Sequence, residues 1–474
     1  MNILKAEFKR KFSISMYKNL KLSLAEMTFA KDFVNDKRGD MYPLLAKDES
    51  CQEIVAHNRY TVRGGDSKRF FCQFFPYATY ETTVADLAGK IGFEFCLPTY
   101  KAFVGVTEKE LVYRCGETQE KVPLPTYLKK EITLIVSCRP SAFDVYFQCN
   151  GRAEFFHTFD CEEFSSSDYL SAFSDAYVAL CVCDCTVKEV LSYLDNGISI
   201  ADIRPIRYEN GEVMIEQGKI YLTASIRMRW EKFQGVFSWV PGTTQFALTG
   251  ALFYDASDGK WGGDVGASIR YNRVSKQWYL WVCMFSSGHI LAHSVFEGDP
   301  RFGINVIDVT LMERAMQTTD ISEFAAFEGD EDPDFFYDEA LKKWRMSICR
   351  LDPEIRKYRY VFFESDNPFD GYKCIGKGNV GVETGGSFVK IDGETFFLCG
   401  NSYHTRSEYR IYHKGGMTNA KFNYPDGGFR GWGTLIPVKM GSRTRYFWLT
   451  FDRHNASDYT WSYGNLYCFE AYDL

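Results

Sequence analysis

Trp278-Tyr-Leu-Trp-Val-Cys-Met284 is one copy of a short aromatic and aliphatic pattern that occurs five times in the second half of the chain. The other copies begin at intervals of 50 to 66 residues, at Lys219–Ser225, Trp344–Arg350, Thr395–Asn401 and Arg445–Phe451. A shorter apolar strand and a turn precede each copy, at Ile203–Tyr208, Val265–Tyr271, Asp334–Tyr337, Ser387–Ile391 and Thr434–Val438. Such a repeat is typical of a propeller blade. Because a propeller closes only when all its blades stack, the repeat predicts one five-bladed β-propeller domain over residues 196–474.

The first 195 residues show a different pattern of short alternating strands and polar turns, which predicts a β-sandwich. The hairpin Ala142–Arg152 resembles one found in concanavalin-like sandwiches. Only two stretches have helical periodicity, Leu20–Phe33 and Thr310–Phe324. The predicted fold is therefore all-β, with an N-terminal jelly-roll or concanavalin-like sandwich over residues 1–195 and the propeller after it.

Composition and charge limit the classes of partner. Lysine and arginine are spread along the 474 residues and the net charge is −7, which argues against a nucleic-acid surface. No apolar run approaches the roughly 18 residues that a membrane span needs. The charged N-terminus lacks the apolar core of a secretory signal. Many of the 15 cysteines lie in apolar strand-like runs, so we expect reduced thiols and a cytoplasmic protein.

Acidic residues recur at the start of the predicted inner strands, which line the central channel of a propeller. Four of the five blades carry one there: Asp202, Asp264, Asp332 and Glu383. A single aspartate before a strand is most often a turn residue, and Asp264, between glycines, fits that interpretation best. Four acids in one relative position favour a shared carboxylate site.

Short motifs around these acids resemble those of glycoside hydrolase family 43 and, more distantly, of family 32. The segment Asp332-Pro333-Asp334-Phe335-Phe336-Tyr337-Asp338 is similar to the blade-three motif of family 43. Glu383 with the glycines after Thr384 looks like the blade-four motif, and Asp202 fits the aspartate of blade one. The resemblance covers roughly residues 196–474 and implies a glycosidase, inverting in stereochemistry. The family's Gly-His-Gly in blade five reads Gly431-Trp432-Gly433, and we expect no metal and no cofactor.

Cleavage of a glycosidic bond requires one carboxylic acid to protonate the leaving oxygen and one carboxylate to activate water or attack the anomeric carbon. The resemblance implies that Glu383 is the acid and Asp202 the base or nucleophile. Asp332 would orient the sugar and raise the pKa of the acid. Further candidates for substrate binding are Arg204, Asp264, Trp432, Arg430 and His404.

Two other functions stay open at this point. A glycoside phosphorylase would use inorganic phosphate, which the basic residues Arg204, Arg406, Arg430 and His404 could bind. A non-catalytic protein would bind sugar in the same pocket. All three functions have a carbohydrate partner, and the sequence leaves open the sugar, its linkage and the oligomeric state, a homo-oligomer included. The run Cys181-Val-Cys183-Asp-Cys185 lacks the spacing of a zinc site and is predicted to pack in the core.

Overall fold

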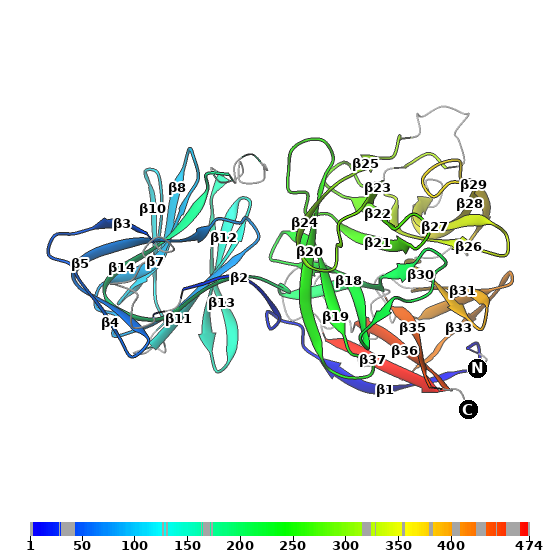
Figure 1. The fold of residues 1–474 in the computed structure, drawn as a ribbon, viewed down its shortest axis with the longest axis horizontal. Coiled ribbons are helices and arrows are strands. Elements are labelled where there is room, and N and C mark those ends of the chain that lie inside the picture. The colour runs from blue at the N-terminus through cyan, green and yellow to red at the C-terminus, as the bar shows by residue number, and fades with distance from the viewer. Residues whose placement is uncertain are drawn as a thin grey trace. The chain divides into compact units, whose positions relative to one another are not determined.

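The computed structural model describes residues 3–27, 29, 43–125, 128, 131–162, 164, 171, 174–314, 324–327, 329–352, 356–378, 383–400, 408–422, 433–441, 443–451 and 465–472. Strands dominate these residues (Figure 1). The chain divides into two compact units, one made of residues 21–195 and the other of residues 1–20 together with residues 196–474.

The larger unit is a five-bladed β-propeller. Its first strands, in blade order, are β15 (Ser199–Pro205), β21 (Val265–Asn272), β26 (Glu331–Asp338), β30 (Thr384–Ile391) and β35 (Thr434–Met440). Its second strands are β18 (Lys219–Arg227), β22 (Gln277–Met284), β27 (Lys343–Asp352), β31 (Glu394–Gly400) and β36 (Arg443–Phe451). Each second strand pairs antiparallel with the first strand of its blade. All five aromatic copies are second strands, which confirms the predicted propeller.

Further strands complete each blade. Blade one adds β17 (Ile215–Glu216), β19 (Lys232–Trp239), β20 (Phe246–Asp255) and β24 (Gly303–Asp308). Blade two adds β16 (Arg207–Tyr208), β23 (Ile290–Phe296) and β25 (Thr310–Leu311). Blade three adds β28 (Lys357–Ser365) and β29 (Lys373–Lys377), and blade four adds β32 (Tyr409–His413) and β33 (Gly416–Asn419).

Blade five closes the ring with the beginning of the chain. Its strand β37 (Leu466–Tyr472) pairs antiparallel with β1 (Glu7–Ile14), which also pairs in parallel with β34 (Lys421–Phe422). Figure 1 shows β1 in blue beside β37 in red. Residues 1–20 therefore lie in the propeller unit, whereas the sequence placed them in the N-terminal domain.

The smaller unit is a single hydrogen-bonded network of strands. It contains β2 (Lys21–Met27), β3 (Leu44–Lys47), β4 (Gln52–Ala56), β5 (Arg59–Gln73), β6 (Thr79–Ala85), β7 (Lys90–Cys96), β8 (Lys101–Thr107), β9 (Glu110–Cys115), β10 (Thr118–Pro123), β11 (Glu131–Arg139), β12 (Ala142–Cys149), β13 (Arg152–Asp160) and β14 (Tyr177–Asp195). The first half of β14 pairs with β5 and β7, and its last part pairs with β2 and β6. This pairing does not distinguish a concanavalin-like sandwich, which stays a prediction.

Neither predicted helix is seen in the described residues. Residues 21–27 form β2, because the apolar residues Leu22 and Leu24 also fit the strand period of two and the segment pairs with β14. Thr310–Leu311 form β25, and residues 315–323 lie outside the described part. No helix in the described ranges is long and apolar enough to span a membrane.

We predict that ring closure depends on Phe8, which is buried on β1 and packs against Phe422 and Trp448. Phe8→Ala should lower the free energy of unfolding of the propeller by about 3–5 kcal/mol, because a buried ring is replaced by a cavity. Denaturant unfolding followed by tryptophan fluorescence measures this, since all nine tryptophans lie in residues 230–461. The control Phe302→Ala removes a half-exposed ring and should give a much smaller loss. Equal losses of stability in the Phe8 and Phe302 variants would contradict a role for Phe8 in closing the ring.

Candidate active site

The first strands of blades one to four share one irregularity, a β-bulge near their beginning. The register shifts lie between Ala201 and Arg204, Val265 and Ser268, Glu331 and Asp334, and Thr384 and Ser387. The residue that follows the first member of each pair has a positive φ: Asp202 (53°), Gly266 (79°), Asp332 (51°) and Gly385 (62°). These four residues are therefore structurally equivalent.

This equivalence separates the predicted acids into two positions. Asp202 and Asp332 occupy the bulge itself in blades one and three. Asp264 and Glu383 lie two residues before the bulge, where blade three has Asp330. The sequence had placed all four acids in one position, because only the strand pairing shows where each bulge begins.

Asp202 and Asp332 lie close enough to interact. Both are buried, with 7% and 5% exposed surface. Burial, and then the negative charge of Asp332, raise the pKa of Asp202 from its usual 3.8 to about 6. Asp202 Oδ2 accepts a hydrogen bond from Ser225 Oγ at 2.5 Å and lies 3.6 Å from Arg227 Nη2. The carboxyl of Asp202 therefore gains or loses its proton near pH 6.

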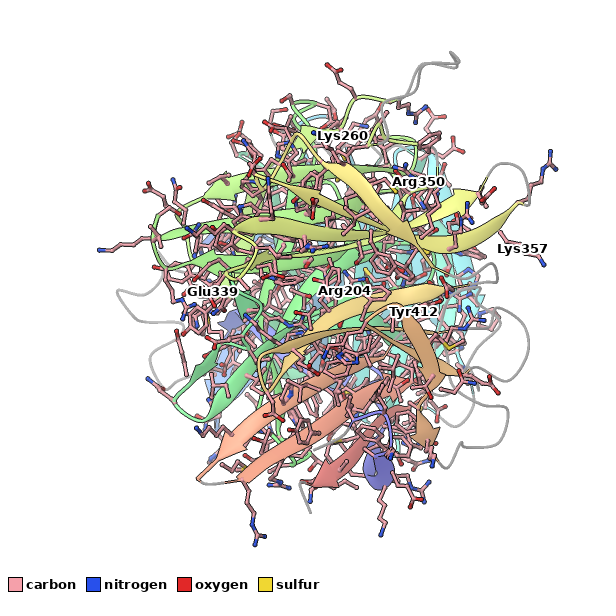
Figure 2. The ribbon with its side chains drawn as sticks, turned by 90° about the vertical axis from the view of Figure 1, so that its right-hand side faces the viewer. Arg204, Lys260, Glu339, Arg350, Lys357 and Tyr412 are labelled. Atoms are coloured by element: carbon pink, nitrogen blue, oxygen red, sulfur yellow. The ribbon has the colours of Figure 1, made fainter. Side chains whose placement is uncertain are left out.

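Asp332 is held by blade four and by an arginine of blade one. Its Oδ2 accepts hydrogen bonds from the Gly385 N–H at 2.9 Å and from Thr384 Oγ1 at 3.2 Å. Arg204 Nη2 lies 3.5 Å from Asp332 Oδ1, and Arg204 Nη1 donates to the Pro333 carbonyl at 2.5 Å. Figure 2 shows Arg204 near the middle of the view. The structure thus brings together three of the predicted site residues.

A second acid of blade three anchors this arrangement. Asp334 is fully buried and accepts hydrogen bonds from Ser268 Oγ (2.8 Å), from the Phe388 N–H (2.6 Å) and from Arg270 Nη2. Arg207 Nη1 lies 3.4 Å from Asp334 Oδ2. Burial alone would raise the pKa of Asp334, but the nearby arginine charges lower it. The sequence analysis missed Arg207 and Arg270, although each interrupts an apolar strand pattern.

We predict that Asp334→Ala lowers the free energy of unfolding of the propeller by about 3–5 kcal/mol, because it leaves buried arginines without a counter-charge. Tryptophan fluorescence during denaturant unfolding measures the loss. Asp366→Ala is the matched control: Asp366 is 84% exposed and pairs with Lys343 at the surface, so its loss should be below about 1 kcal/mol. A loss at Asp334 no larger than this would contradict its role as the anchor.

Glu383 lies near this group, but its carboxylate has other partners. Oε1 accepts hydrogen bonds from Arg410 Nη1 at 2.7 Å and from the Tyr412 hydroxyl, and Oε2 accepts the Tyr360 N–H at 3.2 Å. The side chain is fully buried. Among the described residues, neither Asp202 nor Asp332 contacts this carboxylate. It is bound instead by Arg410 and Tyr412 of blade four and by the Tyr360 N–H of blade three.

The equivalent acid of blade three is bound in the same way. Asp330 is fully buried, and both of its oxygens accept hydrogen bonds at 2.8 Å from Arg350, which Figure 2 labels. Asp264, the third acid of this position, accepts hydrogen bonds from the Ser286 N–H (3.0 Å) and Oγ (2.5 Å). Asp264 is thus held within its own blade by a residue distant in sequence, and not by the neighbouring backbone as a turn residue would be.

Glu331 is a candidate that the sequence analysis missed. It precedes Asp332 directly, is partly exposed (22%), and its Oε1 lies 2.9 Å from His289 Nε2. Burial raises the pKa of Glu331, and the charge of Asp332 adds to the rise against the opposing contacts of His289 and Tyr358. The signal in the sequence was the acidic run itself. Asp332 was preferred to Glu331 within that run because Pro333 follows Asp332 directly.

Trp432, Arg430 and His404 lie outside the described residues, as does Arg406. Within the described ranges, no group of three histidine, cysteine or acidic side chains is arranged to hold a metal ion.

No protein-family model and no curated protein matches the sequence. Solved structures that are similar include an α-L-arabinofuranosidase from Podospora anserina in complex with cellotriose (12% identity, 58% of this chain, 91% of that chain, TM-score 0.38). A thermostable family-43 glycoside hydrolase is 12% identical and matches 58% of this chain and 89% of its own, with a TM-score of 0.38. A family-117 glycoside hydrolase from Zobellia galactanivorans is 11% identical and matches 58% of this chain and 84% of its own, with a TM-score of 0.38. Likeness of this extent carries no argument, and the five-bladed fold rests on the strand pairing above.

We predict that Asp202→Asn changes how stability depends on pH. The folded wild type keeps the Asp202 proton up to about pH 6, while the unfolded chain releases it near pH 3.8, so wild-type stability falls between these values. Asparagine does not titrate and tolerates the positive φ. The stability of the variant relative to wild type should therefore rise by about 2 kcal/mol between pH 4 and pH 6.5. Urea unfolding at several pH values measures this, and a constant difference would contradict the raised pKa.

Proposed function

We propose that the propeller is a glycoside hydrolase whose site is built on Asp202 and Asp332. The observation that carries the proposal is the pair itself: two buried aspartates at equivalent bulges of blades one and three, interacting electrostatically, with the pKa of one raised to about 6. Glycoside hydrolysis requires carboxyl groups that differ in protonation at the same pH. Asp202 can supply the ionised carboxyl above about pH 6, and a further acid beside the pair then supplies the proton.

Each residue has a role in this proposal. Asp202, ionised above about pH 6, acts as the base that activates water at the anomeric carbon. Asp332 and Arg204, which lie 3.5 Å apart, bind and orient sugar hydroxyls. We retain the inverting stereochemistry that the resemblance to family 43 implies.

The proton donor in this proposal is Glu331, and not Glu383 as the resemblance implied. Glu331 is partly exposed, has a raised pKa and lies beside Asp332. Glu383 is fully buried, and its carboxylate is already bound by Arg410 and Tyr412. A general acid must reach the leaving oxygen, and Glu331 has the access that this requires.

One observation favours a second function, a sugar-binding protein without catalysis. The acid that the family resemblance places in blade four is neutralised by Arg410 in this chain. The aspartate pair and Arg204 would then bind sugar hydroxyls without cleaving the glycosidic bond.

A cytoplasmic location is also proposed. All 15 cysteines are free thiols, and a reducing compartment keeps thiols in this state. The substrate would then be a glycan fragment already inside the cell.

We predict that Asp202→Asn and Asp332→Asn each lower kcat/KM by at least about 100-fold on a panel of aryl glycosides. The panel is assayed with and without inorganic phosphate, so that a phosphorylase would show itself by phosphate-dependent turnover. Asp366→Asn, at the exposed surface, is the control and should keep wild-type rates. Saturable sugar binding without turnover of any glycoside would favour the non-catalytic function instead.

Glu331→Gln and Glu383→Gln identify the proton donor. Loss of a general acid slows glycosides with poor leaving groups far more than dinitrophenyl glycosides, which leave without protonation. We expect this selective loss, about 100-fold or more, for Glu331→Gln. Glu383→Gln should slow both classes to the same extent, as a structural change would. The reverse pattern would restore Glu383 as the acid.

A further inference from the structure

The smaller unit contains a polar cavity of about 230 Å³ that the proposed hydrolase does not use. It lies over six neighbouring strands of the network. Each pairs with the next in the order β3, β5, β14, β7, β8 and β9. Charged side chains line most of it, among them Lys68, Lys90, Glu94, Asp66 and Arg114. The cavity is formed entirely within residues 46–182, so its function does not depend on the propeller.

Phe103 lines the cavity and lies over two facing glycines. Gly92 on β7 and Gly105 on β8 are directly paired, and a Cβ on Gly92 would lie 2.4 Å from the Gly105 Cα. A Cβ on Gly105 would lie 2.4 Å from the end of the Phe103 ring. Phe103 therefore covers the glycine pair, and the guanidinium of Arg114 lies 5.0 Å from its ring centre. A larger residue at either glycine would therefore displace the Phe103 ring from this position.

The walls consist of paired charges held in place. Lys68 forms an ion pair with Glu94, and Lys90 Nζ lies 2.6 Å from Asp66 Oδ2. Asp48 adds a third carboxylate, whose Oδ2 accepts the Asp66 N–H at 2.9 Å. The side chains of Lys68 and Glu94 are 23% and 22% exposed, so both members of this pair can reach a ligand. The cavity thus presents hydrogen-bond donors and acceptors side by side.

This alternation selects a class of ligand. An anion such as phosphate needs converging cations, and two of the four lining cations, Lys68 and Lys90, already face carboxylates that would repel it. A sugar hydroxyl both donates and accepts hydrogen bonds, so neighbouring hydroxyls match alternating carboxylates and cations. The volume is below the roughly 300–1,000 Å³ of pockets for drug-sized ligands, which suits a single sugar ring. We propose that this cavity is a second carbohydrate site, which binds the terminal sugar of a neutral glycan.

Hydrogen exchange on the full-length protein tests the proposal. The probes are lactose, cellobiose and xylobiose, with inorganic phosphate and galacturonate as anionic probes. We expect at least one neutral disaccharide to protect amides of β7 and β8 from exchange. Binding by the anionic probes alone, or no protection in these strands by any probe, would overturn the proposal. Because the readout is local to these strands, it is independent of whether the propeller cleaves glycosides.

Two variants assign the site to named residues. Glu94→Gln removes the charge of the central acceptor, and Arg114→Gln removes a donor from an exposed position. Each should weaken the protection of β7 and β8 at least 10-fold in ligand concentration. Glu110→Gln, which lies on β9 and pairs with Lys121 outside the cavity, is the control and should bind as wild type does. If Glu94→Gln alters folding, which its melting curve would show, Arg114→Gln still decides: unchanged binding in that variant overturns the site.

Discussion

The burial of three arginines around Asp334 is the constraint on which the centre of the propeller depends. Arg204 and Arg207 come from the beginning of the propeller chain, Arg270 from blade two and Asp334 from blade three, and all four side chains are buried. Burial lowers the pKa of Arg207 and Arg270, which expresses the free energy that desolvation of these cations requires. One carboxylate of blade three that contacts two arginines of blade two offsets part of that free energy and fixes how these two blades meet. Arg204 is thereby held where it also faces Asp332.

The bulges place the reactive groups on this anchor. A non-glycine residue at positive φ is unfavourable by roughly 1–2 kcal/mol, and aspartate is among the few residues that tolerate it. Blades two and four have glycine at the equivalent position, which avoids this strain, whereas blades one and three have Asp202 and Asp332. Strained acids at two of four equivalent positions are expected where a functional requirement outweighs the local conformational preference. In the function proposed above, the catalytic use of these two carboxyls is that requirement.

The sequence predicted the blades well because each contains a complete local signal. An aromatic strand, a turn and a shorter apolar strand are close in the chain, so their repeat reveals the propeller without knowledge of contacts. Signals that depend on distant pairing were missed. Glu7–Ile14 alternates like any strand, but its partners are at the far end of the chain. Lys21–Met27 fits helix and strand periods alike, and pairing with β14 determines the outcome. The position of each bulge is likewise known only from the strand pairing. The division of the acids into two positions follows from it.

That division determines how the acids should be interpreted. The position two residues before the bulge contains Asp264, Asp330 and Glu383, and each is buried and bound to a partner within its own blade: Ser286, Arg350 and Arg410. The same position with the same type of contact in three blades indicates a common structural role, in which an acid fixes the end of the inner strand against the outer part of its blade. The bulge position differs, because there two acids, Asp202 and Asp332, interact with each other. Glu383 resembles a catalytic acid in sequence, but its structural equivalents are Asp264 and Asp330, and this is why the proton donor is sought at Glu331, beside the bulge.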